Sequence, residues 1–593
     1  MITMVIGVSK EYCDDKQSCQ NLLLELKAGS SSLSEIRRRD LLIIVWKNSV
    51  RRIDMAMIGV MDDTKQHEEM ENDMFGVKED TNLFEEMMES AKDRMIHSVE
   101  ELLGGEFPNR GSYENVHTWL SSVLTSYITC IDEIGEGAYK RRVEPKLEDL
   151  ISRARVALAL FISISPRDNT ELISVIPNGP SWLFHVDKKD LYLNAEKIAD
   201  VVVAKDGTGK YSTVNAAIAA APQHSQKRFI IYIKTGIYDE IVVIENTKPN
   251  LTLIGDGQDL TIITCNLSAS NVRRTYNTAT VASNGNGFIG VDMCFRNTAG
   301  PAKGPVVALR VSGDMSVICR CRVEGYQDAL YPHSDRQFYR ECFITGTVDF
   351  ICGNAVAVFQ FCQIVARQPK MGQSNVITAQ SRATKDVKSG FSIQNCNITA
   401  SSDLDTATVK TYLGRPWRRF STVAVLQSFI GDLVDPAVWT PWKGETGLST
   451  LHYREYQNRG PGAVTSRRVK WSGFKVMKDP KEATEFTVAK LLDGETWLKE
   501  SRIPYESGFK KVISGKYHEG LYYLEGTVVK AEKSVPHAEN GGKSVIKAVV
   551  GVRKKKSRKV TFSVNLIQRT YSIWLWNHQF KVEMNHQQKN QIV

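Results

Sequence analysis

Short runs of β-branched and aromatic residues recur about every 20 to 25 positions between residues 200 and 471, with no long helical pattern between them. Glycine, asparagine and aspartate separate these runs, as in RFIIYIKTGIYDEIVVI, NLTLIGDG, TIITC and GFIGVDMCFRNTAG. A repeat of this length is typical of a solenoid, in which each coil buries its face against the next. The repeat therefore favours a parallel β-helix, although the number of strands alone would also fit a β-sandwich.

Two pairs of residues share one spacing in and just before the stretch GYQDALYPHSDRQFYRECFITGTVDFICGN. Asp328 and Asp349 lie 21 positions apart, and so do Cys321 and Cys342, each just upstream of one aspartate. A solenoid with one coil per 21 residues places equivalent positions on adjacent strands, about 4.8 Å apart. The double offset favours the β-helix over the sandwich and predicts that the two carboxyl groups face each other.

Two neighbouring carboxyl groups do not ionise equally, because the charge on one raises the pKa of the other. One can then act as an acid while the other acts as a nucleophile or base, which suits cleavage of an ester or a glycoside. The alternative is that both aspartates bond loop backbone, as turn aspartates often do. Three neighbours favour the catalytic interpretation: Gln327 is an amide donor, Arg415 can hold a carboxylate by two hydrogen bonds, and Trp417 offers a flat face to a sugar.

The chain divides into four predicted parts. Residues 1–165 are predicted to form a helical bundle, since apolar residues in LFEEMMESAKDRMIHSVEELL recur at helical spacing. Prolines and a glycine break residues 166–197, which we expect to be a linker. The β-helix follows at 198–508 and ends in a helical segment, EATEFTVAKLLDGETWLKESRIPY, that we expect to close it. Residues 509–593 are basic and lack a period, so we expect a disordered tail.

Charge and targeting features limit the partners. The formal net charge of +9 suits a polyanion; nucleic acid is the obvious one, but no zinc-finger spacing or RNA-binding signature is present, and an acidic polysaccharide fits equally well. No run of about 18 apolar residues occurs, so no membrane span is predicted. Sequons at Asn250, Asn266 and Asn397 are compatible with secretion, whereas Met1–Val8 lacks the basic start and long apolar core of a signal peptide.

Several blocks resemble the signature motifs of plant pectin methylesterases. They are GYQDALYPHS, GTVDFICGN and YLGRPW, with AKDGTGKYSTVNAAI, FRNTAGPAK and YREYQNRGPGA in family order around them, over about residues 198–508. TWLSSVLTSYITC in the helical part is similar to the inhibitor-like pro-region of these enzymes. The resemblance implies a right-handed, all-β parallel β-helix preceded by an all-α bundle. It also implies hydrolysis of the methyl esters of homogalacturonan, a pectin, to pectate and methanol, in the cell wall after secretion.

The resemblance assigns a role to each matching residue. Asp349 corresponds to the nucleophile that forms an acyl-enzyme, and Asp328 to the acid that protonates methanol and then activates water as a base. Gln327 corresponds to a donor that stabilises the oxyanion. Arg415 corresponds to the residue that holds nucleophile and substrate, and Trp417 to a ring that lines the sugar cleft.

Further correspondences concern substrate contact, crosslinks and cofactors. Thr275 matches a threonine that contacts the substrate. The cysteine pairs of the chain that match the family's disulfides are Cys321 with Cys342 and Cys362 with Cys396. Buried free thiols are the alternative that composition alone leaves open. No metal or organic cofactor is implied.

The chain departs from the family pattern at four places. Pro305 stands where the family has a second oxyanion glutamine, and Cys352 where it has a phenylalanine. Cys130 lacks its usual partner in LFEEMMES, and Lys188–Lys189 matches the Arg-rich processing motif only loosely. The two site changes support an alternative, a catalytically weakened or silent β-helix that binds pectin. A glycoside hydrolase or a calcium-dependent lyase is disfavoured, because no further acidic cluster accompanies the two aspartates.

Overall fold

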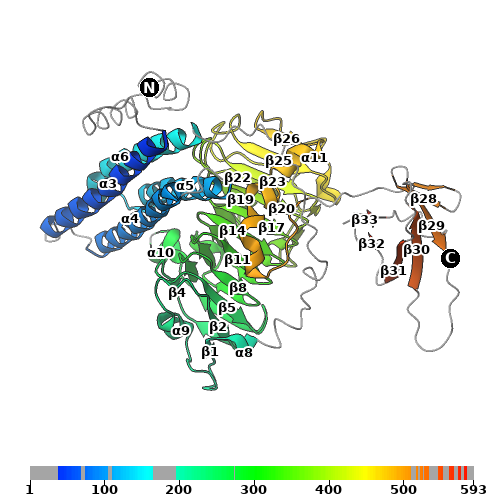
Figure 1. Cartoon of the computed structure of the whole chain (residues 1–593), viewed down its shortest axis with the longest axis horizontal. Coiled ribbons are helices and arrows are strands. Elements are labelled where there is room, and N and C mark those ends of the chain that lie inside the picture. The colour runs from blue at the N-terminus through cyan, green and yellow to red at the C-terminus, as the bar shows by residue number, and fades with distance from the viewer. Residues whose placement is uncertain are drawn as a thin grey trace. The chain divides into compact units, whose positions relative to one another are not determined.

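The structure, a computed structural model, describes residues 38–67, 74–104, 110–163, 195–272 and 274–508, together with short strands between residues 516 and 583 (Figure 1). The predictions made for Met1–Val8, Cys19 and Lys188–Lys189 lie outside the described residues. Described residues up to Ser507 belong to one compact unit, and the strands from Lys516 onward belong to a second. No helix among the described residues is long and apolar enough to cross a membrane.

Among the described residues, four long helices form the predicted bundle. They are α3 (Arg38–His67), α4 (Met74–Leu103), α5 (Arg110–Glu133) and α6 (Ala138–Ser163), and each packs against two others in the cyclic order α3, α4, α5, α6. The apolar stripe predicted for α4 is buried in the bundle core: Leu83, Met87, Ala91, Met95, Val99 and Leu102. The prediction of a helical bundle is therefore confirmed.

The region after the bundle winds through three parallel sheets, which confirms the predicted parallel β-helix. Among the described residues, the eleven-stranded sheet contains β1 (Val201–Val203), β2 (Phe229–Ile233), β5 (Leu251–Gly255), β8 (Ile289–Val291), β11 (Ser316–Cys319), β14 (Arg336–Arg340), β17 (Val356–Gln360), β20 (Gly390–Gln394), β23 (Thr422–Leu426), β25 (His452–Tyr456) and β26 (Phe474–Val476).

The other two sheets complete each coil. In the described part of the chain, the eight-stranded sheet contains β3 (Gly236–Asp239), β6 (Thr261–Cys265), β9 (Cys294–Asn297), β12 (Arg322–Glu324), β15 (Phe343–Gly346), β18 (Gln363–Ala366), β21 (Asn397–Ala400) and β24 (Phe429–Ile430). The seven-stranded sheet, again counted over described residues, contains β4 (Val242–Ile244), β7 (Val281–Ser283), β10 (Leu309–Val311), β13 (Leu330–Pro332), β16 (Ile351–Gly353), β19 (Asn375–Gln380) and β22 (Thr411–Pro416).

Strand register explains the 21-residue offset. Val323 of β12 pairs with Ile344 of β15, and Leu330 of β13 pairs with Ile351 of β16. Side chains that point inward from all three sheets share one continuous apolar core, which stacking of coils produces. The coil that carries Asp328 therefore lies directly beside the coil that carries Asp349.

Short helices cover parts of the solenoid. They are α8 (Ala195–Ile198), α9 (Val214–Ala220), α10 (Ala269–Val272), α11 (Pro480–Thr484), α12 (Val488–Leu491) and α13 (Gly494–Trp497). Helix α9 starts at the N-cap Thr213, packs on β1, β2 and β4, and buries Val214 and Ile218 in the core. The segment expected to close the solenoid is helical, but its apolar residues pack against outward-facing residues of β8, β11, β14 and β17. It therefore covers a side of the β-helix.

The predicted disulfides are not formed in the structure. All four cysteines are buried free thiols, and each sulfur donates to a backbone carbonyl; for example, Cys321 Sγ lies 3.4 Å from the Cys319 oxygen and Cys342 Sγ lies 3.3 Å from the Ile318 oxygen. Cys362 and Cys396 behave in the same way. Stacked positions point their side chains in parallel, whereas a disulfide needs Cβ vectors that converge. Cys130 is also a buried free thiol.

The second unit contains antiparallel strands where we expected a disordered tail. The strands are β27 (Lys516–His518), β28 (Leu521–Leu524), β29 (Thr527–Glu532), β30 (Val545–Gly551), β31 (Val560–Asn565), β32 (Ser572–Leu575) and β33 (Phe580–Glu583). Runs such as TVVKAE and VTFSVN are rich in β-branched residues, which favour strands. The basic composition of the region concealed this local preference.

Candidate active site

Asp328 and Asp349 occupy the same turn in two adjacent coils, between the eight-stranded and the seven-stranded sheet. The Asp328 N–H donates to the Val348 oxygen at 3.0 Å, which ties the two turns together. Both aspartates have a positive φ, 58° and 52°, in the left-handed region that non-glycine residues rarely adopt. Strain of this kind concentrates at functional sites, where the surrounding structure holds it.

Arg415 of β22 holds Asp349 by a bidentate contact. Its Nε–H donates to both carboxylate oxygens, at 2.8 and 3.1 Å, and its Nη2–H donates to Oδ2 at 2.5 Å. Only 5% of the Asp349 side chain is exposed. A guanidinium in this geometry both orients a carboxylate and favours its charged form.

The two aspartates differ in electrostatic surroundings. Burial raises the pKa of Asp328 well above its ordinary value, and the neighbouring Asp349 raises it further. Burial also raises the pKa of Asp349, but the hydrogen bonds and charge of Arg415 oppose that rise. Asp328 is therefore the group that retains a proton and Asp349 the group that ionises first. This is the division of roles that the sequence predicts for an acid and a nucleophile.

Gln327 lies directly beside Pro305 of the preceding coil. The two residues form an isolated parallel β-bridge, and the Val306 N–H donates to the backbone oxygen of Gln327 at 3.0 Å. A side chain at position 305 would thus stand next to the Gln327 amide. Proline has neither a side-chain amide nor a backbone N–H, so this position supplies no donor.

Aromatic rings line the site on one side of the aspartates. Trp417 stacks on Trp442 with ring centres 6.1 Å apart and 20° between the planes, and it also contacts Tyr331 at 6.5 Å. The Arg415 guanidinium lies 4.3 Å from the centre of the Trp442 ring, which is 38% exposed. Cys352, at the position expected to carry a phenylalanine, is buried in the cluster that includes Tyr331. The sequence analysis identified Trp417 but not Trp442 or Tyr331. The only sequence signal for these two residues was their place in the short motifs TPWKG and ALYPHS.

Thr275 lies where the end of α5 meets the β-helix. It precedes the short 3-10 helix η2 (Tyr276–Thr278), and the Tyr276 N–H donates to Glu133 Oε1 at 3.3 Å. Burial raises the pKa of Glu133 to about 7, and the backbone N–H groups of Tyr276 and Thr275 partly offset this rise. The negative charge of Glu133 in turn raises the pKa of Asp328. The bundle therefore reaches the predicted catalytic pair.

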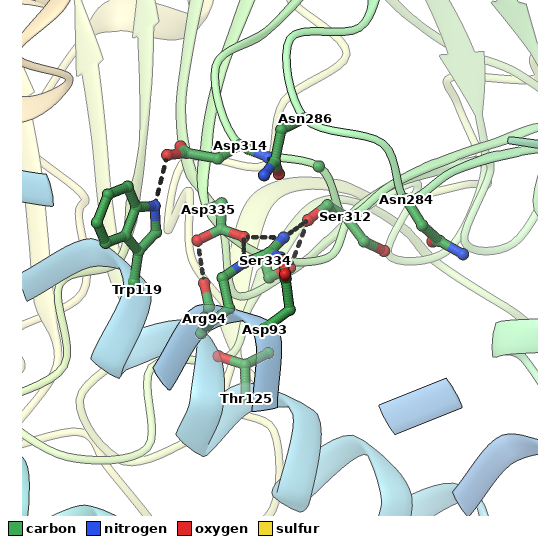
Figure 2. Close-up of polar contacts among 12 residues, drawn as sticks. Asp93, Arg94, Trp119, Thr125, Asn284, Asn286, Ser312, Asp314, Ser334 and Asp335 are labelled. Carbon is green, nitrogen blue, oxygen red and sulfur yellow. Dashed lines mark hydrogen bonds and ion pairs between the residues drawn. The ribbon is translucent and has the colours of Figure 1, made fainter. Parts of the chain in front are cut away.

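Buried ion pairs hold α4 and α5 on the β-helix (Figure 2). Arg94 of α4 donates from Nε to Asp335 Oδ2 at 2.8 Å and from Nη2 to the Ser312 oxygen at 3.1 Å. The Trp119 indole N–H of α5 donates to Asp314 Oδ2 at 3.0 Å. Burial raises the pKa of Asp335 to about 6 although Arg94 opposes the rise. Sequence reasoning did not find these residues.

A small cavity remains between α5 and the site. It is lined by Thr125, Ile128, Thr129, Asp132 and Glu133 of α5 and by Tyr331, His333, Gly353, Asn354, Ser381 and Trp417 of the β-helix. His333 is buried between Ser312 and Thr129, and burial lowers its pKa well below the ordinary value, so the ring is neutral. Within the described residues, no group of three or more His, Cys, Asp or Glu side chains is placed to hold a metal ion.

The described chain thus contains a parallel β-helix with two aspartates on adjacent turns. Residues 200–495 match the pectinesterase family, and residues 9–160 match the plant invertase/pectin methylesterase inhibitor family. The chain belongs to the pectinesterase family, whose members are carboxylic ester hydrolases, and carries an inhibitor-type domain. This confirms the resemblance seen in the sequence.

Individual relatives agree. A probable pectinesterase/pectinesterase inhibitor 19 of Arabidopsis thaliana is 94% identical over 512 residues, which cover 86% of this chain and 98% of that protein. Pectinesterase 1 of Solanum lycopersicum is 42% identical over 503 residues, 83% of this chain and 90% of that protein. The solved pectin methylesterase from carrot is 48% identical with a TM-score of 0.52, and the match covers 52% of this chain and 98% of that one.

Proposed function

We propose that this chain hydrolyses the methyl esters of homogalacturonan in pectin, with Asp349 as nucleophile and Asp328 as acid and base. The observation that carries the proposal is the Arg415–Asp349 contact beside a second, protonated aspartate. The names of the relatives indicate the same substrate. The aromatic wall of Trp417 and Trp442 suits the faces of sugar rings.

The reaction proceeds in two steps. The Asp349 carboxylate attacks the ester carbonyl, a C–O bond to the enzyme forms, and the bond to the methoxy group breaks while Asp328 transfers its proton to the leaving methanol. The product of this step is an acyl-enzyme anhydride. Asp328, now ionised, takes a proton from water, whose oxygen attacks the galacturonyl carbonyl and releases pectate and the Asp349 carboxylate. Gln327 donates to the oxyanion in both steps.

Methanol release from methylated pectin by residues 198–508, without the bundle, tests this proposal. We expect turnover in the wild type and its loss in Asp349→Asn, which keeps the shape of the side chain but cannot act as a nucleophile. An Asp328→Asn variant should form the acyl-enzyme slowly and fail to release it. Equal methanol release by the wild type and Asp349→Asn would refute the assignment.

A second candidate function is pectin binding with weak turnover, which the bridge between Pro305 and Gln327 favours. One missing oxyanion donor typically lowers turnover by about 100- to 1,000-fold. Pro305→Gln should then raise the rate by a factor in this range, whereas Pro305→Leu, which adds a side chain without a donor, should not. Equal rates in the two variants would exclude the oxyanion explanation.

The bundle is proposed to act as an intramolecular inhibitor, since α5 residues line a cavity together with Tyr331 and Trp417, the aromatic residues proposed to face the sugar. We propose the domain limits 1–165, 166–197 and 198–508 and secretion to the cell wall, where this plant family acts. A full-length fusion to a fluorescent protein, followed in plasmolysed plant cells, checks the location. Signal retained inside the plasma membrane would contradict secretion.

A further inference from the structure

Helix α5 ends with two consecutive carboxylates, and both contact the β-helix beside the predicted substrate residues. Asp132 forms an ion pair with Arg418, which follows Trp417 in the chain. Glu133 accepts a hydrogen bond from the backbone N–H of Tyr276, which follows Thr275. These two carboxyl groups thus lie against residues that adjoin the sugar-binding side chains.

Arg418 has hydrogen-bonding capacity that Asp132 does not use. The ion pair joins Asp132 to Nη2, and the buried Nε–H of Arg418 has no hydrogen-bond partner in the part of the chain that the structure describes. A guanidinium binds a carboxylate best through two parallel N–H groups. Since an unpaired buried donor is unfavourable, Arg418 is better matched to a planar carboxylate that reaches both nitrogens than to Asp132.

The end of α5 is fixed at this place by a second arginine. Arg274 Nε–H donates to the Glu133 backbone oxygen at 2.9 Å, and its guanidinium also pairs with Asp80 and Glu79 of α4. The Glu133 carboxyl group lies close enough to Asp328 to affect its pKa. The bundle therefore presents a carboxyl group at the catalytic pair.

We propose that Arg418 and the Tyr276 N–H are binding sites for carboxyl groups of the galacturonan chain, and that Asp132 and Glu133 occupy them by mimicking that polymer. The inference rests on the proposed function, because galacturonan carries one carboxyl group on every sugar ring. Arg418 selects a free carboxylate over a methyl ester, which has no charge. De-esterified stretches of pectin therefore compete with α5 for the same sites and displace the bundle from the catalytic pair.

Calorimetric binding of two ligands to the full chain tests this inference. The ligands are unesterified hexagalacturonate and its fully methyl-esterified form, at pH 8, in an Asp349→Asn background, which lacks the nucleophile and forms no acyl-enzyme. Asp132→Asn removes the competitor at Arg418, so we expect the unesterified ligand to bind about tenfold to hundredfold more tightly and the esterified ligand to gain less. Arg418→Gln added to Asp132→Asn should abolish the preference for the unesterified ligand.

Glu136→Gln is the matched control. Glu136 lies three residues beyond Glu133 and pairs with Lys140 at the surface, with its side chain 89% exposed, so the same loss of charge should leave both affinities unchanged. An equal gain in affinity for both ligands in Asp132→Asn would overturn the proposal, because it would mean that the bundle opens but that Arg418 does not recognise a free carboxylate. A preference that survives Arg418→Gln would overturn it as well. Binding needs no turnover, so failure of methanol release would leave this result interpretable.

Discussion

Replacing Arg94 by methionine should release the bundle from the β-helix. Methionine has a similar length but no charge, so the Asp335 carboxyl group, which is 0% exposed, would lose its ion pair and keep a hydrogen bond from the Ser122 hydroxyl. Removal of one partner of a buried ion pair typically costs about 3–5 kcal/mol. At about 1.4 kcal/mol per factor of ten, the open form should become more populated by about 100-fold or more.

The size of this effect should depend on pH. Burial already raises the pKa of Asp335 to about 6, and Arg94 acts to lower it, so Arg94→Met raises it further. At pH 8 the carboxylate is charged in the open form and the full cost applies. At pH 5 a protonated Asp335 is easier to bury alone, so the cost is smaller.

Hydrogen exchange of backbone amides in the full chain measures this opening without any need for activity. We expect faster exchange in α4, α5, β10 and β13 in Arg94→Met than in the wild type, with the larger difference at pH 8. Lys92→Met is the control on the same helix, since Lys92 pairs with Asp54 where both side chains are about two-fifths exposed. Such a pair contributes less than about 1 kcal/mol. Equal exchange rates in Arg94→Met and Lys92→Met at pH 8 would refute the proposed role of the Arg94–Asp335 ion pair.

Three further outcomes are expected. Arg415→Lys loses the bidentate contact and raises the pKa of Asp349, so the acidic limb of the kcat/KM profile should move to higher pH. The pKa of Glu133 is raised from 4.5 to about 7, so its contact is fully stabilising below pH 4.5 and is lost as pH rises through 7; the protection factors of amides at the end of α5, which correct for the intrinsic pH dependence of exchange, should be lower at pH 8 than at pH 5. Gly353→Ala should lower the free energy of unfolding by about 3 kcal/mol or more, read from Tm, because at φ 141° an added Cβ would lie 2.1 Å from the Pro332 oxygen.

Each of these has a distinct control. If the acidic limb of the kcat/KM profile does not move in Arg415→Lys, Asp349 is not the group whose ionisation produces that limb. Glu133→Gln should give protection factors that do not depend on pH in this range, and a retained dependence would assign it to another group. Gly372→Ala, at φ 84° with no atom within 4 Å, should cost only about 1–2 kcal/mol of backbone strain. Equal Tm changes at the two glycines would exclude the clash.

The solenoid and its aspartate pair could be predicted because they leave a periodic trace. Asp328 and Asp349 share their offset with the strand register, which repeats along the sequence. For Cys321 and Cys342 the equal offset reports stacking only; the disulfide that the family resemblance implies is not formed in the structure, where both residues are free thiols. A period identifies neighbours; it does not say whether they can bond.

The docking of the bundle left no comparable trace. Arg94 and Asp335 are 241 positions apart, and nothing local marks either as a partner of the other. One signal was present at the end of α5, where Asp132 and Glu133 place negative charge at a helix C-terminus. The helix dipole disfavours that arrangement, so an external partner is expected. Which residues serve as these partners, Arg418 for Asp132 and Tyr276 for Glu133, is decided by the tertiary structure.

The contacts of α4 and α5 bear on how the β-helix unfolds. Coils of a solenoid interact only with their neighbours, so they can melt one after another from an end. Helix α4 binds Asn284 through Glu86 and Asp335 through Arg94, and α5 binds Lys388 through Glu114, so the bundle crosslinks coils that do not touch one another. Loss of any one of these coils then disrupts contacts shared by the others, and the solenoid gains a cooperativity that its own stacking does not provide.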